Sequence, residues 1–134
     1  MPGYSGTPLP KKLGIKDGFQ VSLTDAPDEV VAELKPILDK CEIVSASKTP
    51  IDFAMFFTKS SAALQKEFPR LAKRLTPAGL LWVSWPKKTS GVPTDLTENI
   101  VRETGLATGL VDVKVCAVTD IWSGLKFVRR LKDR

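Results

Sequence analysis

The segment 85–95 carries the side chains best suited to hold a ligand. It combines two ammonium groups, three hydroxyls, an indole and one glycine. Ammonium and hydroxyl groups donate hydrogen bonds to phosphate or carboxylate oxygens, so this composition predicts a site for an anionic small molecule or a protein partner. The candidate binding residues are Trp85, Lys87, Lys88, Thr89, Ser90, Thr94 and Asp95. The alternative is a surface loop in which the lysines are solvated, Trp85 is core and Asp95 only caps a helix.

The common catalytic residue sets are missing. The 134 residues include no His and two Cys, Cys41 and Cys116. Without His there is no Ser-His-Asp triad and no HExxH zinc site, and two Cys cannot make a Cys₄ site or a disulfide framework. We therefore expect no metal and no identifiable catalytic residue. The spacing around Gly91 also differs from that of a phosphate-binding P-loop.

The excess positive charge lies at one end of the sequence. Of the formal net charge of +5, residues 126–134 contribute +4, with five basic residues against Asp133. Nucleic-acid binding favours interleaved aromatics or a wider basic face, so we expect no nucleic-acid partner, with a basic-tail interaction module as the alternative. Arginines at a strand end commonly keep a sheet edge soluble. Asp112, Lys114 and Asp120 are typical of a solvated sheet face, although they could line an edge site.

The sequence contains no apolar run near the roughly 20 residues that a membrane-spanning helix needs. Residues 1–8 lack the basic start and apolar core of a signal peptide. Cys41 and Cys116 lie in apolar stretches, as reduced thiols of a cytosolic protein do. We therefore predict a cytoplasmic protein, monomeric or homodimeric, that makes no membrane contact.

Alternating strands and helices are expected to position the 85–95 segment. Apolar periodicity predicts strands at 19–23, 41–45, 51–58 and 80–85, and helices at 7–13, 25–38, 60–75 and 95–108. The strands 51–58 and 80–85 are nearly all apolar, which indicates central positions covered on both faces. Ligands of open α/β sheets bind outside the carboxyl ends of the strands, and the 85–95 segment leaves such an end.

Local signals set the expected boundaries of these elements. Asp25 is expected to cap a helix with Val30, Val31, Leu34 and Leu38 inside, and Pro36 to end or kink it. Asp95 to Glu98 has the spacing of a capping box. Residues 76–79 favour a turn, and 111–117 with 125–128 favour an antiparallel hairpin. The prediction is an α/β domain over 7–134, mostly parallel, with helices flanking a twisted sheet, after a flexible arm at 1–6.

Two stretches of this pattern resemble a known fold. Residues 50–57, Pro-Ile-Asp-Phe-Ala-Met-Phe-Phe, are similar to the fourth strand of class I, Rossmann-like methyltransferases, with its early acid at Asp52. Residues 70–84 are similar to the helix, turn and fifth strand that follow in that fold. The C-terminal hairpin matches its last two strands. The resemblance implies a methyltransferase-like topology and, in the family, S-adenosylmethionine (SAM) as methyl donor.

The cofactor half departs from that pattern. Where the family has a glycine-rich loop, residues 23–29 contain no glycine, and residues 43–47 contain no acid for a ribose. Asp25, Asp28 and Glu29 would also repel a pyrophosphate at a helix N-terminus. We therefore expect a topology lacking the glycine-rich loop, with its nucleotide site lost or rebuilt and no cofactor.

Several segments resemble a bacterial family of domains of unknown function, namely 4–15, 85–92, 94–98, 109–117 and 122–128. This resemblance implies a bacterial cytosolic setting without an assigned activity. The preferred hypothesis is a non-catalytic or degenerate methyltransferase-like domain that binds an anionic small molecule or protein partner through the 85–95 loop. The alternatives are a SAM-dependent methyltransferase with an atypical cofactor loop, an acyl- or phosphate-handling enzyme, and the basic-tail module.

Overall fold

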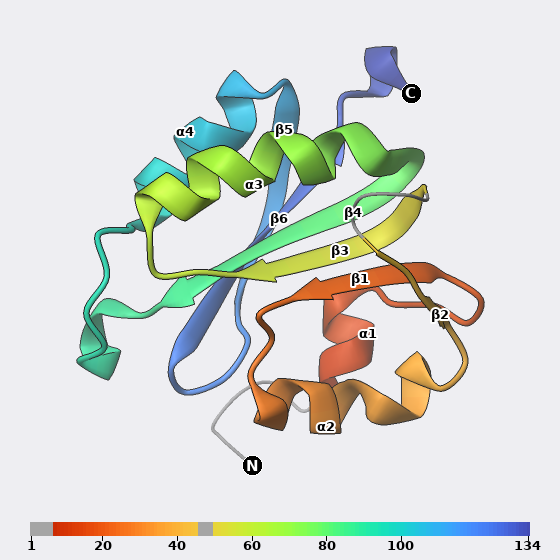
Figure 1. Ribbon diagram of the computed structural model, residues 1–134, viewed down its shortest axis with the longest axis horizontal. Coiled ribbons are helices and arrows are strands. Elements are labelled where there is room, and N and C mark those ends of the chain that lie inside the picture. The colour runs from red at the N-terminus through yellow and green to blue at the C-terminus, as the bar shows by residue number, and fades with distance from the viewer. Residues whose placement is uncertain (1–6, 46–49) are drawn as a thin grey trace.

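The computed structural model describes residues 7–45 and 50–134, whose strands form a six-stranded sheet (Figure 1). The strand order is β2-β1-β3-β4-β6-β5, with β1 to β4 parallel and β6 antiparallel to both of its neighbours. The strands are β1 (Gln20–Thr24), β2 (Glu42–Ile43), β3 (Ile51–Phe57), β4 (Leu75–Pro86), β5 (Leu110–Ala117) and β6 (Trp122–Arg129). The predicted fold class and hairpin are thus confirmed. The arm expected at 1–6 lies outside the described residues, and the single-domain division stays a prediction.

Helices cover both faces of the sheet (Figure 1). They are α1 (Leu9–Leu13), α2 (Asp28–Leu38), α3 (Ser61–Arg74) and α4 (Glu98–Ala107), with short 3-10 turns η1 (Lys88–Ser90) and η2 (Leu131–Asp133). One core joins α1 and α2 to the sheet through residues such as Leu13, Leu34 and Trp82. The other joins α3 and α4 to it through Phe68 and Val101. The central strands β3 and β4 contribute to both cores, which explains their continuous apolar sequence.

The helices begin at different residues from those that local signals favour, except α3. Ser60, where the predicted helix 60–75 begins, caps α3, and its Oγ accepts a hydrogen bond from the Ala63 N–H at 3.2 Å. The cap of α4 is Thr97 rather than Asp95, with the Thr97 Oγ1 accepting from the Ile100 N–H at 3.2 Å. Asp25 does not cap α2. The N-cap residue is Pro27, two residues later, and Asp25 itself adopts a left-handed φ of 57°.

Two further details of α2 differ from the prediction. Val31, which was expected on the inner face, is 39% exposed, whereas Val30 and Leu34 are fully buried. Pro36 lies within the last turn, and the helix continues to Leu38. Proline near a helix end removes one hydrogen bond but leaves the final residues able to keep helical angles.

Residues 76–79, predicted as a turn, lie inside β4, where they form an irregularity without partners on β3. The register of β3 against β4 shifts between Ile51 and Phe53, and the side chain of Asp52 supplies hydrogen bonds there. Its Oδ2 accepts from the Gln20 N–H at 2.8 Å, and its Oδ1 accepts from the Thr76 hydroxyl at 3.1 Å. Asp52 therefore holds the amino ends of β1 and β4 against β3 and has a structural role.

The hairpin forms an edge of the sheet. Val113 sits at a register shift of β5, and Val113 and Val115 are 52% and 49% exposed. Asp112 accepts from the Arg102 Nε at 2.9 Å, so it belongs to an ion pair with α4 rather than to a simply solvated face. Along the described ranges 7–45 and 50–134, no helix is long and apolar enough to cross a bilayer.

Candidate functional site at the carboxyl edge of the sheet

The four parallel strands end along one edge of the sheet, at Thr24, Ile43, Phe57 and Pro86. From β1 the chain passes through α2 to β2 on one side, and β3 then pairs with the other side of β1. The strand order therefore reverses between β1 and β3. Open α/β sheets bind ligands outside the carboxyl ends of the strands at such a reversal. The loops 25–27 and 58–60 border this switch point.

The loop after β1 is acidic and sharply turned. Asp25 has a φ of 57°, in the left-handed region that glycine favours and that Asp tolerates better than most residues. Asp25, Asp28 and Glu29 are all exposed, and the last two lie in the first turn of α2. Carboxylates in the first turn interact favourably with the positive end of the helix dipole. The switch point thus presents three negative charges on an ordered turn.

The loop after β4 is fastened beside the end of β3. The Thr94 hydroxyl donates to the Lys59 carbonyl at 2.7 Å. The Asp95 carboxylate accepts from the Ser61 N–H at 2.8 Å. Because Lys59 lies in the 58–60 loop, these bonds bring the predicted 85–95 site next to the switch point.

This loop encloses a cavity of about 570 Å³. Its lining residues are Trp85, Pro86, Lys88, Gly91, Val92, Pro93, Thr94, Asp95, Leu96, Thr97 and Glu98. Four of the seven predicted binding residues therefore lie together on the cavity wall, namely Trp85, Lys88, Thr94 and Asp95. Lys87, Thr89 and Ser90 are not part of this lining.

The remaining predicted residues shape the turn of η1. The Ser90 hydroxyl donates to the Lys87 carbonyl at 2.6 Å and accepts from the Val92 N–H at 3.2 Å. The Lys87 N–H donates to the Ile121 carbonyl at 2.7 Å, which ties the loop to the start of β6. Gly91 follows with a φ of 77°. These hydroxyl and amide groups hold the loop, and Thr89 is exposed to solvent.

The cavity combines an apolar floor with a rim of mixed charge. Trp85 and Leu96 are each 5% exposed and form the floor. Lys88 brings a positive charge, whereas Asp95 and Glu98 bring negative charges, and Glu98 pairs with Arg102 at 2.6 Å. Such a lining suits an organic molecule with an apolar body and one polar group better than a bare phosphate.

Sequence reasoning missed the second half of this wall. Leu96, Thr97 and Glu98 lie on this wall, and the sequence predicts them only as parts of a helix start. The short loop between β4 and the cap residue Thr97 could have indicated this, because it keeps the first turn of α4 near the end of β4.

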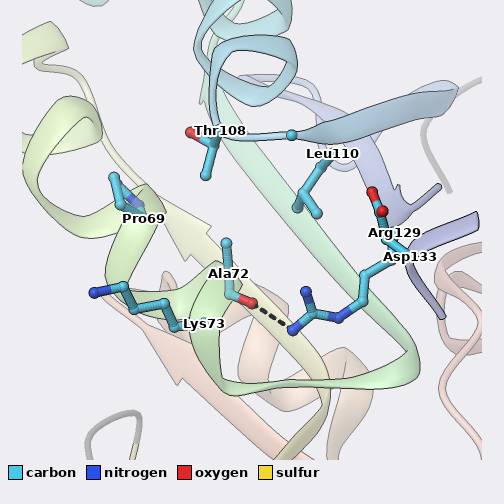
Figure 2. Close-up of a pocket in the computed structure, with 8 residues that line it drawn as sticks. Pro69, Ala72, Lys73, Thr108, Leu110, Arg129 and Asp133 are labelled. Atoms are coloured by element: carbon cyan, nitrogen blue, oxygen red, sulfur yellow. Dashed lines mark hydrogen bonds between the residues drawn. The ribbon is translucent and has the colours of Figure 1, made fainter.

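A second cavity, of about 300 Å³, lies away from this edge, between the C-terminal ends of α3 and α4 and the last strand (Figure 2). Arg129 reaches into it, and its Nη2 donates to the carbonyls of Ala72 at 2.9 Å and Leu75 at 2.8 Å. Carbonyls at the end of a helix lack intrahelical donors, so Arg129 satisfies the end of α3. Arg129 therefore does more than keep a strand end soluble.

Sequence comparisons and structure comparisons differ in outcome. No protein-family model matches this sequence, and no curated protein matches it. Among solved structures, magnesium protoporphyrin IX methyltransferase from Synechocystis PCC 6803 with bound SAH has a TM-score of 0.59 at 12% identity, covering 90% of this chain and 78% of that one. The same enzyme with bound SAM has a TM-score of 0.58 at 12% identity, covering 91% and 74%. A SAM-dependent methyltransferase from Aquifex aeolicus has a TM-score of 0.57 at 16% identity, covering 87% and 85%.

The chain thus has the fold of class I SAM-dependent methyltransferases, with a six-stranded sheet in its described part. The expectation of no cofactor is wrong, because solved structures of this fold hold SAM or SAH. That expectation assumed that acids in the loop after β1 would repel a pyrophosphate. SAM has no pyrophosphate and carries a sulfonium and an ammonium. Exposed carboxylates at the switch point fit such a molecule, since they accept hydrogen bonds from ammonium and ribose hydroxyl groups.

Proposed function

We propose that this protein is a SAM-dependent methyltransferase with an atypical, acidic cofactor loop. The observation that carries the proposal is the adjacency of two features on one sheet edge. The switch point between β1 and β3 lies beside the cavity of the 85–98 segment, and the Lys59 carbonyl that accepts from Thr94 belongs to the loop between them. A methyl donor and an acceptor need neighbouring sites of this kind.

Three carboxylates would hold the donor. Asp25, Asp28 and Glu29 offer acceptors for its ammonium and ribose hydroxyls, and their negative charge complements its sulfonium. The left-handed angle of Asp25 turns the backbone directly after β1, where glycine would do so without a side chain. When bound, SAM supplies a methyl group attached to a positively charged sulfur, ready for transfer to a nucleophile.

The cavity residues would hold the acceptor. The buried faces of Trp85 and Leu96 exclude water and contact an apolar body, and the Lys88 ammonium binds a carboxylate or other anionic substituent. Thr94 and Asp95 position this wall through their bonds to Lys59 and Ser61. This assignment retains the predicted anion preference for Lys88, as one contact within a mostly organic site.

Isothermal titration calorimetry with SAM and SAH tests the proposal. We expect both to bind, and we expect Asp28→Asn combined with Glu29→Gln to weaken SAM binding at least about tenfold, because each change removes a charged acceptor. Glu33→Gln, an exposed change on the same helix, is the control and should bind as the native protein does. No heat of binding at millimolar SAM or SAH, with the protein folded, would contradict the proposal.

The setting proposed for this activity is the bacterial cytoplasm. It is supported by the resemblance of segments 85–92 and 109–117 to a bacterial family, and by the two free cysteines, Cys41 and Cys116. We also propose a monomer or homodimer. Light scattering on the purified protein distinguishes these states from larger assemblies.

A further inference from the structure

Lysines of β5 and β6 face each other without an intervening acid. Lys114 is paired directly with Lys126 in the antiparallel register, and Lys126 is paired with Trp82 of β4 on its other side. Like charges directly opposite each other on one face of a sheet are destabilising. The Lys126 Nζ lies 5.9 Å from the centroid of the Trp82 ring, which offsets part of that repulsion.

A third lysine joins this pair from α1. The Lys12 Nζ donates to the Ala117 carbonyl at 3.1 Å, and the Lys114 Nζ donates to the Lys12 carbonyl at 3.1 Å. We call Lys12, Lys114 and Lys126 the lysine cluster. Burial raises the pKa of the Cys116 thiol, while the charges of all three lysines act to lower that pKa. Burial, and next the charge of Lys114, lower the pKa of Lys126.

The two strand lysines of the cluster form no ion pair with an acid of the described residues. Within the described ranges, the ion pairs join Lys35, Arg70 and Arg102 to acids, and none includes Lys114 or Lys126. The sequence places no Asp or Glu in segments 1–6 or 46–49. Two facing lysines, Lys114 exposed and Lys126 half-buried, repel each other and are suited to an anion from solution.

We propose that the lysine cluster binds a doubly charged oxyanion, the phosphate group of a small phosphorylated molecule. Three ammonium groups supply donors to several oxygens of one tetrahedral group, and a phosphate monoester carries a charge of about −1.5 to −2 at pH 7. The cluster lies on the sheet face that packs against α1 and α2, because Trp82 and Cys116 belong to that core. Trp85 and Leu96 of the cavity belong to the opposite core, so this site is separate from the proposed methyltransferase site and does not depend on it.

Thermal unfolding and calorimetry with inorganic phosphate and glucose 6-phosphate test the proposal, with sodium chloride at equal ionic strength as reference. We expect both phosphates to raise Tm more than chloride does. Lys114→Met and Lys126→Met should each raise Tm in chloride, because repulsion is relieved, and weaken phosphate binding at least about tenfold. Lys11→Met, an exposed change of the same charge on α1, should keep the native response. Lys126→Arg should fold and retain phosphate binding, because it keeps the charge.

Three results would overturn the proposal. Equal increases in Tm with phosphate and chloride would show general screening of the lysines. An undiminished phosphate response in both methionine variants would place the anion elsewhere. Binding of a single-stranded oligonucleotide that depends on Lys114 and exceeds the binding of glucose 6-phosphate would make the cluster a nucleic-acid interface.

Discussion

Helix α4 packs closely against β6 at Gly105, and a single methyl group at this position tests the packing that supports the candidate site. A Cβ on Gly105 would lie 2.0 Å from the Phe127 Cε2 and 2.5 Å from its Cδ2. Phe127 is fully buried and contacts Phe68 edge to face, with ring centroids 5.1 Å apart. Its ring therefore cannot move away without displacing α3.

The expected effect of Gly105→Ala is a balance of two terms. Alanine is favoured over glycine inside a helix by about 1 kcal/mol. Overpacking a well-filled core typically destabilises by about 1–3 kcal/mol. The Phe127 ring atom would lie only 2.0 Å from the added Cβ, so the ring must shift far, and we expect a cost at the upper end of this range. We expect a net loss of about 2 kcal/mol in the free energy of unfolding, and a Tm lower by about 5–8 °C.

Urea and thermal unfolding measure this loss, with Ala107→Gly as the control on the same helix. Ala107 is exposed and is the last residue of α4, so its change should show the propensity term alone, a loss of at most about 1 kcal/mol. The double variant Gly105→Ala with Phe127→Leu should lose less stability than the two single changes added together, because leucine vacates the space of the ring. A Gly105→Ala protein as stable as the native one, or strict additivity in the double variant, would refute the reasoning.

Two further predictions concern polar groups of the sheet. Ser84 is fully buried, and its Oγ has no hydrogen-bond partner among the described residues. Ser84→Ala should therefore leave the free energy of unfolding, measured with urea, unchanged or raise it by up to about 1 kcal/mol. A lower urea midpoint would mean that the hydroxyl is bonded. Hydrogen bonding to Arg102 lowers the pKa of Asp112. The pair therefore stabilises the fold fully at pH values above the ordinary Asp pKa, and this stabilisation is lost as the pH falls through the lowered pKa. Asp112→Asn should therefore lower Tm at pH 7, with a difference from the native protein that shrinks in acid, whereas a difference independent of pH would contradict the assignment.

The central positions of β3 and β4 could be anticipated from sequence, because burial on two faces leaves a continuous apolar pattern. The first and last residues of helices and strands are harder to predict, since neighbouring residues often have the same capping or turn preference. Thr97 and Asp95 are both good caps, and the choice of Thr97 depends on Asp95 accepting from Ser61, a residue far away in sequence. The turn signal of Pro77 and Gly79 coincides with the irregularity of β4, where residues 76–79 have no partner on β3 and the Thr76 hydroxyl donates to Asp52 instead.

The 85–95 segment was located correctly as a loop at the carboxyl end of a strand, but composition does not say which of its polar groups are already used. The hydroxyls of Ser90 and Thr94 bond to backbone carbonyls of the protein. The Ser90 bond closes a turn locally, as hydroxyls in short loops often do, whereas the Thr94 bond fastens the loop to Lys59, 35 residues earlier. Lysine is longer and cannot close these turns, which is why Lys88 stays exposed on the cavity wall.

The acidic loop after β1 shows why a charge pattern must be judged against a particular ligand. Asp25, Asp28 and Glu29 disfavour a pyrophosphate, and the same three carboxylates favour a molecule that carries a sulfonium and an ammonium. The chain thus separates charge by location, with acids at the switch point and the lysine cluster beside α1. A cationic donor and a phosphorylated ligand would then be attracted to different sites of one domain, so SAM should bind equally well in Lys114→Met and native protein, and phosphate equally well in the Asp28 and Glu29 variant.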